Sequence, residues 1–232
     1  MARWPEVPDV YGWLSLTENG QWRLHPQGDA LVAGEPGTEG QASSSSDSYP
    51  TADARRYGAG EAITSPPILH FIDRNYTHDV YGQWYFQNGP QKVYVRLDGA
   101  PYILQTSTNA GDVLGLRTHN GLEVSSIKSG WLDDTGRLYA MTDHGPGLVA
   151  GRDLPTVLSE LKTTAGDRLL DVLDDATLGQ DPRAVVHLAT EGGAATLAVC
   201  RADEIPGRLG FVRYPRPLAE NRADGMTTSR KR

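Results

Sequence analysis

The sequence predicts an α+β fold of mostly antiparallel β-sheets, arranged in two similar β-rich halves with two or three short helices. Three observations support this prediction. Short stretches of alternating apolar and polar residues recur along the chain, separated by Asn-Gly, Asp-Gly and Gly-Pro turns. A few stretches instead repeat apolar residues at helical spacing. One hairpin outline occurs twice, as QWYFQNGPQKVYVRL at residues 83–97 and RLYAMTDHGPGLVAGRD at residues 137–153.

The N-terminal half opens with a hairpin and continues with a helix and three strands. In residues 12–24, GWLSLTENGQWRL, alternating strands flank an Asn-Gly turn. Residues 65–75 are predicted to form a helix, because Ser65 suits the N-cap and Pro66 suits the first helical position. The strands QWYFQ, KVYVRL and PYILQT follow. In KVYVRL, Val93 and Val95 are expected to face the core, and Lys92, Tyr94 and Arg96 are expected to form a polar outer face.

The C-terminal half continues the alternation, with further turns at Asn-Gly and Asp-Thr-Gly. Residues 153–166 are predicted to form a second helix, which the last glycine stops. The stretch DRLLDVLDDATLG predicts a third helix, short and acidic. A hairpin about Gly192-Gly193 and the stretch LGFVRYP complete the pattern.

Composition divides the chain further. Residues 27–62 are rich in Gly, Ser, Ala and acidic residues, and they hold few large apolar side chains. Such a segment buries too little surface to offset the entropy of ordering it, so we expect a disordered insertion. Deleting residues 28–61 should then change the melting temperature by only a few degrees. The predicted parts are an N-terminal β-rich half with one helix (1–26 and 63–108), the insertion (27–62), a C-terminal β-rich half with helices (109–215) and a disordered tail (216–232).

The recurring hairpin suggests one supersecondary unit used twice. Aligning Gly89-Pro90 with Gly145-Pro146 also aligns Arg96 with Arg152. The turn glycines Gly82 and Gly136 precede the first strand of each copy. Chance similarity between two β-hairpins is the alternative, because glycine turns are common.

The order of these stretches resembles a family of uncharacterised proteobacterial proteins known only as a domain of unknown function. The resemblance rests on GWLSL…GQWRL, PPILHFIDRNY, GQWYFQNGPQKVYVRLDGAPYIL, GLRTHNGLEV, GWLDDTGRLYAMTDHGPGLVAGRDL and the terminal LGFVRYPRP. It covers nearly the whole chain except residues 27–62. A looser similarity extends to a second family of unknown function that shares the two-part repeat. That similarity implies repeated α+β motifs and a signalling or binding role, and neither family supplies functional residues.

Charge and composition exclude several function classes. The formal net charge is −7 and the isoelectric point about 5.3, which argues against nucleic acid or an anionic membrane as a partner. Cys200 is the only cysteine, so a cysteine zinc cluster and an intrachain disulfide are excluded. The sequence shows no signal peptide and no apolar stretch of roughly 20 residues, and we expect a cytoplasmic protein. No motif implies a cofactor or a catalytic reaction.

The leading hypothesis is a non-enzymatic binding or regulatory module for a small ligand or a protein partner. Aromatic residues concentrate in the first hundred residues, and adjacent Trp84 and Tyr85 cannot both face the core. We therefore predict a binding groove on the outer face of a sheet, although packing alone would also explain these aromatic residues. The predicted groove residues are Tyr76, Trp84, Asn88, Tyr94 and Arg96.

Two alternatives stay open. His78-Asp79 and Asp143-His144 each stand beside a turn of the repeat, and together they would supply two imidazoles and two carboxylates for a metal or acid–base site. Ordinary turn chemistry also explains these residue types. The second alternative is a homodimer that acts as a structural protein without a ligand.

Overall fold

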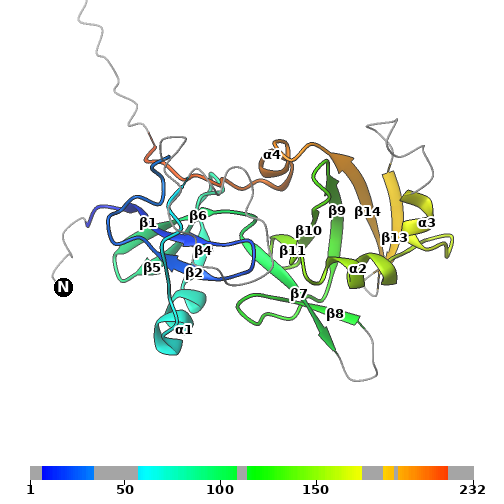
Figure 1. Ribbon diagram of the computed structural model, residues 1–232, viewed down its shortest axis with the longest axis horizontal. Helices are drawn as coiled ribbons and strands as arrows, with labels where there is room; N and C mark the ends of the chain where they lie inside the picture. The colour runs from blue at the N-terminus through cyan, green and yellow to red at the C-terminus, as the bar shows by residue number, and fades with distance from the viewer. Residues whose placement is uncertain (1–6, 34–56, 109–113, 174–184, 191–192, 219–232) are drawn as a thin grey trace, which may run out of the picture.

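The predicted fold class is confirmed. The computed structural model of the chain describes residues 7–33, 57–108, 114–173, 185–190 and 193–218. Within these residues the chain forms a six-stranded sheet, an eight-stranded sheet and four short helices (Figure 1). In chain order the elements are β1 (Val10–Leu16), β2 (Trp22–Leu24), β3 (Glu61–Ala62), α1 (Pro66–Arg74), β4 (Tyr76–His78), β5 (Trp84–Asn88), β6 (Gln91–Leu97), β7 (Tyr102–Thr108), β8 (Leu114–Thr118), β9 (Ile127–Asp133), β10 (Leu138–Thr142), β11 (Pro146–Val149), α2 (Leu154–Glu160), β12 (Lys162–Thr163), α3 (Leu169–Leu173), β13 (Val185–Thr190), β14 (Gly193–Cys200) and α4 (Ile205–Leu209).

Each sheet contains a run of five strands with the same arrangement. The runs are β2-β1-β6-β5-β4 and β8-β7-β11-β10-β9. In each run a hairpin is followed by a three-stranded antiparallel meander, whose last strand pairs parallel with the first strand of the hairpin. The origin of both runs from one duplicated unit stays a prediction. β7, which we expected in the N-terminal half, begins the run of the second sheet.

Both sheets are mixed rather than purely antiparallel. Within the described part of the chain, the pairs β1–β6, β7–β11 and β9–β14 are parallel. A parallel pair requires a crossover connection, and each of these pairs joins strands that are separated by other elements in sequence. Alternation along a strand does not reveal such distant partners.

A single turn type accounts for much of the recurring sequence pattern. In five turns a threonine or aspartate side chain accepts a hydrogen bond from the backbone N–H four residues later. The residue between them, three positions after the acceptor, is a glycine with φ between +77° and +94°. Only glycine adopts this conformation without strain, and it closes a hairpin loop with a bulge. The acceptors are Thr17, Asp79, Thr118, Asp133 and Thr163.

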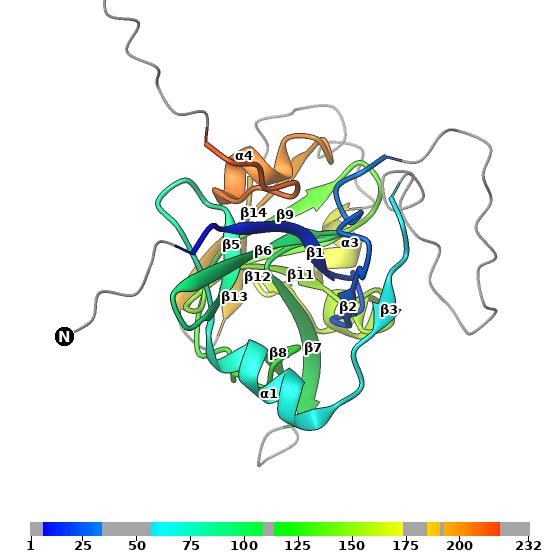
Figure 2. The ribbon, with the colours of Figure 1, turned by 90° about the vertical axis from the view of Figure 1, so that its left-hand side faces the viewer.

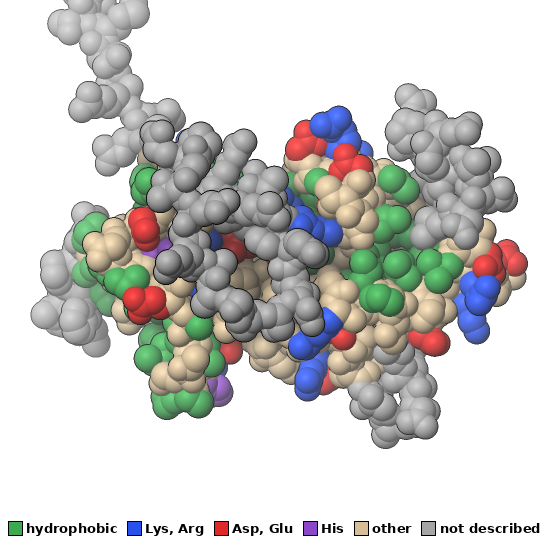
Figure 3. Space-filling view, in the orientation of Figure 1, with side chains coloured by type: hydrophobic (Ala, Val, Ile, Leu, Met, Phe, Trp, Pro, Cys, Tyr) green, Lys and Arg blue, Asp and Glu red, His purple; other side chains and the backbone are tan. Residues whose placement is uncertain are grey.

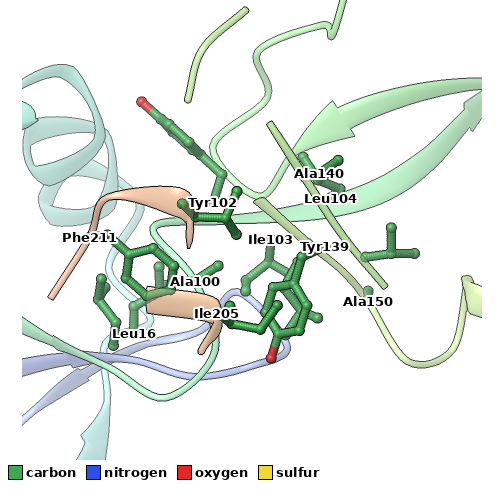
Figure 4. Close-up of a cluster of buried hydrophobic side chains, with 14 of the residues drawn as sticks. Leu16, Ala100, Tyr102, Ile103, Leu104, Tyr139, Ala140, Ala150, Ile205 and Phe211 are labelled. Carbon is green, nitrogen blue, oxygen red and sulfur yellow. The ribbon is translucent and has the colours of Figure 1, made fainter. Parts of the chain in front are cut away.

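The two sheets share one hydrophobic core. Figure 4 shows Leu16, Ile103 and Tyr139, from β1, β7 and β10, packed with Ile205 of α4 and with Phe211. All five side chains are buried. Burial of this much apolar surface from both sheets makes the junction between them part of the core rather than an interface.

Aromatic rings extend this core beneath the N-terminal sheet. The ring of Tyr102 lies edge-on to Trp84, with centroids 5.3 Å apart, and to Tyr76, at 6.0 Å. The hydroxyl of Tyr76 donates to the carbonyl of Pro101 at 3.2 Å. The inner face of the N-terminal sheet is therefore closed by the start of the C-terminal sheet.

The helices match the sequence unevenly. α1 begins at Pro66 after Ser65, as predicted, although the Ser65 side chain makes no capping hydrogen bond. α2 is shorter than the predicted helix over residues 153–166, because Lys162 and Thr163 instead pair with β13. α3 lies within the stretch where the third helix was expected, and residues 174–179 of that stretch lie outside the described residues. α4 was missed, and the stretch LGFVRYP forms no strand. None of the helices in the described ranges is long and apolar enough to span a membrane.

The outer face of the N-terminal sheet is only partly open to solvent, contrary to the polar face expected for β6. Figure 2 looks onto this sheet, with β1 and β6 side by side. Arg96 of β6 is buried because residues 27–33 and 57–60 pass over part of this face, where Ala30 is also fully buried. Tyr94 of β6 is buried too, and its ring packs against those of Tyr11 and Tyr85. These two stretches are the ends of the predicted insertion. Its middle, residues 34–56, and residues 219–232 of the predicted tail lie outside the described residues.

Candidate functional site

The outer face of the N-terminal sheet carries an open hollow of about 530 Å³. We call it the tyrosine hollow. It is formed by the β4–β5 turn, the neighbouring faces of β5 and β6, the residue before β1, and the chain after α4. Its lining residues are Asp9, His78, Asp79, Val80, Tyr81, Tyr85, Lys92, Tyr94 and Leu218.

Tyr85 and Tyr94 of the sheet line the hollow, and Tyr11 stacks on Tyr94. The ring of Tyr94 lies parallel to that of Tyr11, with centroids 4.5 Å apart, and 5.4 Å from the ring of Tyr85. The hydroxyl of Tyr94 donates to Asp79 Oδ2 at 3.2 Å. Burial, the neighbouring Tyr11 and the carboxylates of Asp79 and Asp9 all raise the pKa of Tyr94 far above its ordinary value. Tyr94 therefore stays a neutral hydrogen-bond donor at any physiological pH.

The β4–β5 turn holds two apolar side chains in solvent at the rim. Asp79 Oδ1 accepts hydrogen bonds from the backbone N–H groups of Tyr81 and Gln83, each at 2.9 Å. The carbonyl of Gly82 accepts a bond from the backbone N–H of Val212 at 2.9 Å. The turn is thus fixed at both ends, while Val80 is 92% exposed and Tyr81 61% exposed.

Charges of both signs surround the tyrosines. The ammonium of Lys92 lies 4.9 Å from the centroid of the Tyr85 ring, which is within range of a cation–π contact. Asp9 and Asp79 oppose it with two carboxylates. The hollow therefore offers aromatic faces, a carboxylate-rich rim and one resident cation.

A second, buried polar cluster lies farther along the same face. Ser15 Oγ lies 2.8 Å from His25 Nε2, and His25 Nδ1 lies 3.5 Å from Asp29 Oδ1. These residue types in this order resemble a nucleophilic triad. However, Ser15 and His25 are almost fully buried, and His25 Nδ1 makes no hydrogen bond within the described residues. A Cβ on Gly60 would lie only 2.7 Å from His25 Nε2, so the glycine packs directly against the imidazole. With Ser15 sealed in this way, the contacts serve to join strands and loop.

Arg96 completes this cluster and ties both ends of the predicted insertion to the sheet. Its Nη1 donates to the carbonyls of Ala30 at 2.7 Å and Gly58 at 3.2 Å, and its Nε pairs with Asp98 at 2.9 Å. Its guanidinium carbon also lies 5.4 Å from the centroid of the Tyr57 ring. Because these hydrogen bonds all join Arg96 to other parts of the fold, Arg96 has a structural role here.

The five residues of the predicted groove do not share one surface. Tyr76 and Trp84 belong to the buried inner face, and Asn88 is exposed at the far end of the β5–β6 hairpin. Arg96 lies in the buried polar cluster, and only Tyr94 lines the hollow.

The outward aromatic residue that alternation predicted is Tyr85. Of the other residues that line the hollow, Tyr94 was predicted for the groove, and His78 and Asp79 for a metal site; the rest were not predicted. Tyr81 and Lys92 carried a usable signal, since Tyr81 precedes a turn glycine and Lys92 shares a face with Tyr94. Asp9 and Leu218 carried none, because only the fold brings the two ends of the described chain to this place.

The four residues of the predicted metal site also serve local roles. Asp79 fixes its turn, and His144 Nε2 lies 2.7 Å from the carbonyl of Glu123. Asp143 Oδ2 accepts a bond from the backbone N–H of Ser125 at 3.2 Å. Nδ1 of His78 lies 2.9 Å from the carbonyl oxygen of Asp79. Among the described residues, no three His, Cys, Asp or Glu side chains stand close enough to hold a metal ion.

Comparison with known proteins gives a family and a pair of similar structures. The model of a family named DUF2944 and described as "Protein of unknown function (DUF2946)" matches residues 1–216. No curated protein matches the chain. A crystal structure of a DUF1285 family protein from Silicibacter pomeroyi DSS-3 is 14% identical, with 84% of this chain and 82% of that chain covered and a TM-score of 0.43. For a DUF1285 family protein from Shewanella baltica OS155 these values are 13%, 66%, 92% and 0.38.

Proposed function

This chain belongs to the protein family of unknown function described as DUF2946, and we propose that it is a non-enzymatic binding module that holds a segment of a partner protein in the tyrosine hollow. One observation carries the proposal. Val80 and Tyr81 stand in solvent on a turn that Asp79 holds fixed, beside the packed rings of Tyr85 and Tyr94. Large apolar side chains held rigidly at a surface are typical anchors of protein interfaces.

The shape of the hollow favours a protein segment over a small molecule. Pockets for small ligands enclose most of the ligand surface. Here the rim residues Val80, Tyr81 and Leu218 are themselves largely exposed, so they would be covered only by a larger partner. Tyrosine-rich surfaces gain contact area at low entropic cost, which suits recognition of a peptide segment.

A displayed library of random short peptides tests the proposal. We expect the wild-type protein to enrich a peptide motif, and Tyr81→Ser and Val80→Ser to lose that enrichment. Val32→Ser is the matched control, because Val32 is also a largely exposed valine but does not line the hollow. Equal enrichment by Val80→Ser and Val32→Ser would falsify the proposal.

A homodimer without a ligand, the other interaction hypothesis from the sequence, stays a prediction. Apolar side chains gather on the surface over α1 (Figure 3), where Ile68 and Phe71 are exposed. Light scattering of the wild type and of Ile68→Ser would show whether this surface supports self-association.

A further inference from the structure

The tyrosine hollow already holds one cation of its own, which indicates the chemistry of its ligand. The ammonium of Lys92 lies over the ring of Tyr85 at 4.9 Å from the centroid. Lys92 is only half-buried, and its stem comes from the same face of β6 as Tyr94. A positive group therefore fits against these rings within the geometry of the fold.

The electrostatics of the hollow favour a positive group over a negative one. The formal charges of Asp9, Asp79 and Lys92 sum to −1, and the whole chain carries −7. Burial is the largest cause that raises the pKa of Tyr11 and that of Tyr94, and the carboxylates of Asp9 and Asp79 raise both pKa values further. The hydroxyls of both tyrosines thus lie in a negative potential. Of the two, Tyr94 lines the hollow, where this potential favours a cation.

Resting on the proposed function, we infer that the partner segment inserts a cationic side chain, a guanidinium or an alkylammonium group, against Tyr85 and Tyr94, and that Lys92 is an internal competitor for this position. The incoming cation takes the ring contact of Lys92, while the carboxylates of Asp9 and Asp79 balance its charge. An apolar side chain would use the rings but not the carboxylates. An acidic side chain would meet both carboxylates at close range.

Choline and its uncharged carbon isostere, dimethylbutanol, form a matched pair of probes that differ mainly in charge. We would titrate each into the full chain at constant ionic strength and follow the backbone amide chemical shifts. Choline is expected to shift the resonances of Tyr81, Tyr85 and Lys92, and the isostere is expected to shift them much less. Exposed cation–π contacts account for about a two- to fivefold difference in affinity.

Variants of residues in the hollow distinguish binding that depends on the positive charge of choline from nonspecific apolar binding. Lys92→Met removes the competitor and is expected to tighten choline binding about two- to fivefold. Asp9→Asn removes one carboxylate and is expected to weaken it. Tyr85→Leu keeps an apolar surface but should abolish the preference for choline over its isostere. Thermal unfolding of each variant confirms that it is folded, and Lys128→Met, outside the hollow, is the control for removing a positive charge.

The outcomes distinguish this inference from the proposal on which it rests. If choline and the isostere bind equally, or if Lys92→Met leaves choline binding unchanged, the inference of a cationic side chain is wrong. If peptides without Arg or Lys are still enriched, and the Val80 and Tyr81 variants lose that enrichment, the proposed binding module is supported and only the inference of a cationic side chain is wrong. Enrichment of Arg- or Lys-containing peptides, lost in Tyr85→Leu, supports both.

Discussion

At the scale of single residues, the partly buried histidine His119 couples the fold to pH. Its Nδ1 accepts a hydrogen bond from the backbone N–H of Ile103 at 3.3 Å, and its Nε2 has no hydrogen-bond partner in the described structure. The ring lies 5.7 Å from Trp22 within the aromatic part of the core. Burial lowers the pKa of His119 to about 3.

This pKa predicts acid sensitivity with a definite sign. Between an ordinary histidine pKa of about 6.5 and a folded value of about 3, the unfolded chain binds a proton that the folded chain does not. Stability is therefore fully present above pH 6.5 or so and falls as the pH drops toward about 3, by at most roughly 5 kcal/mol. Chemical denaturation at several pH values should show a shallower acid loss for His119→Gln than for wild type. Parallel curves would contradict this account.

At the same scale, two glycines in the same type of turn predict different costs. Gly82 and Gly136 both adopt a positive φ, +77° and +81°. A Cβ on Gly82 would lie 2.4 Å from the carbonyl oxygen of Gly210, whereas a Cβ on Gly136 would meet nothing within 4 Å. Gly136→Ala should cost about 1–2 kcal/mol through backbone strain alone. Gly82→Ala should cost clearly more and should also weaken peptide binding, because it displaces the turn that carries Val80 and Tyr81. Equal losses of unfolding free energy for the two variants, measured by denaturant unfolding, would show that the turn at Gly82 accommodates a Cβ without further cost.

At the scale of elements, the contacts of Arg96 reverse the expectation that residues 28–61 are dispensable. Deleting them removes the carbonyls of Ala30 and Gly58, and the buried guanidinium keeps only Asp98 of these three partners. Hydrogen bonds to a charged group contribute about 1.5–3 kcal/mol each, so we expect a loss of about 3 kcal/mol or more, which is roughly 10 °C in melting temperature. A shorter deletion that keeps residues 28–33 and 57–61 is the control and should cost much less. Similar melting temperatures for the two deletions would show that the contacts of Arg96 with Ala30 and Gly58 do not stabilise the fold measurably.

The elements also show where sequence reasoning succeeds and where it stops. α1 was predictable because Ser65 and Pro66 mark its start and because its apolar residues have helical spacing. α4 was missed, although Pro206 near its first turn and Gly210 in a left-handed C-cap are the usual signals. The buried outer face of β6 had no local signal. At Arg96 this burial depends on residues 27–33 and 57–60, whose composition resembles that of a disordered chain.

At the scale of the whole molecule, local patterns predicted the two sheets but not how they pair and meet. The hairpins β1–β2 and β13–β14 follow from glycine turns between alternating strands. The parallel pairing of β1 with β6 joins strands far apart in the sequence, so no window of sequence contains it. The tyrosine hollow gathers Asp9, Tyr85 and Leu218 from distant parts of the chain. For the same reason, only Tyr94 of the five residues predicted for the groove lines it.

The shared core predicts that the two halves unfold together despite their similar topology. Ile103 at the start of β7 is fully buried between the sheets, and the backbone N–H of Leu97 donates to the carbonyl of Arg213 across the same junction. If each half were an independent domain, Trp84 and Trp131 would report separate transitions. We expect fluorescence from single-tryptophan variants, in which only Trp84 or only Trp131 of the five tryptophans remains, to give the same denaturation midpoint. Ile103→Ala should lower both midpoints equally and should reduce the unfolding free energy by about 2–5 kcal/mol. The reason is that the cavity it leaves lies in a core that neither sheet forms alone. Midpoints that separate, or an Ile103→Ala effect confined to one probe, would mean that each sheet folds as its own domain.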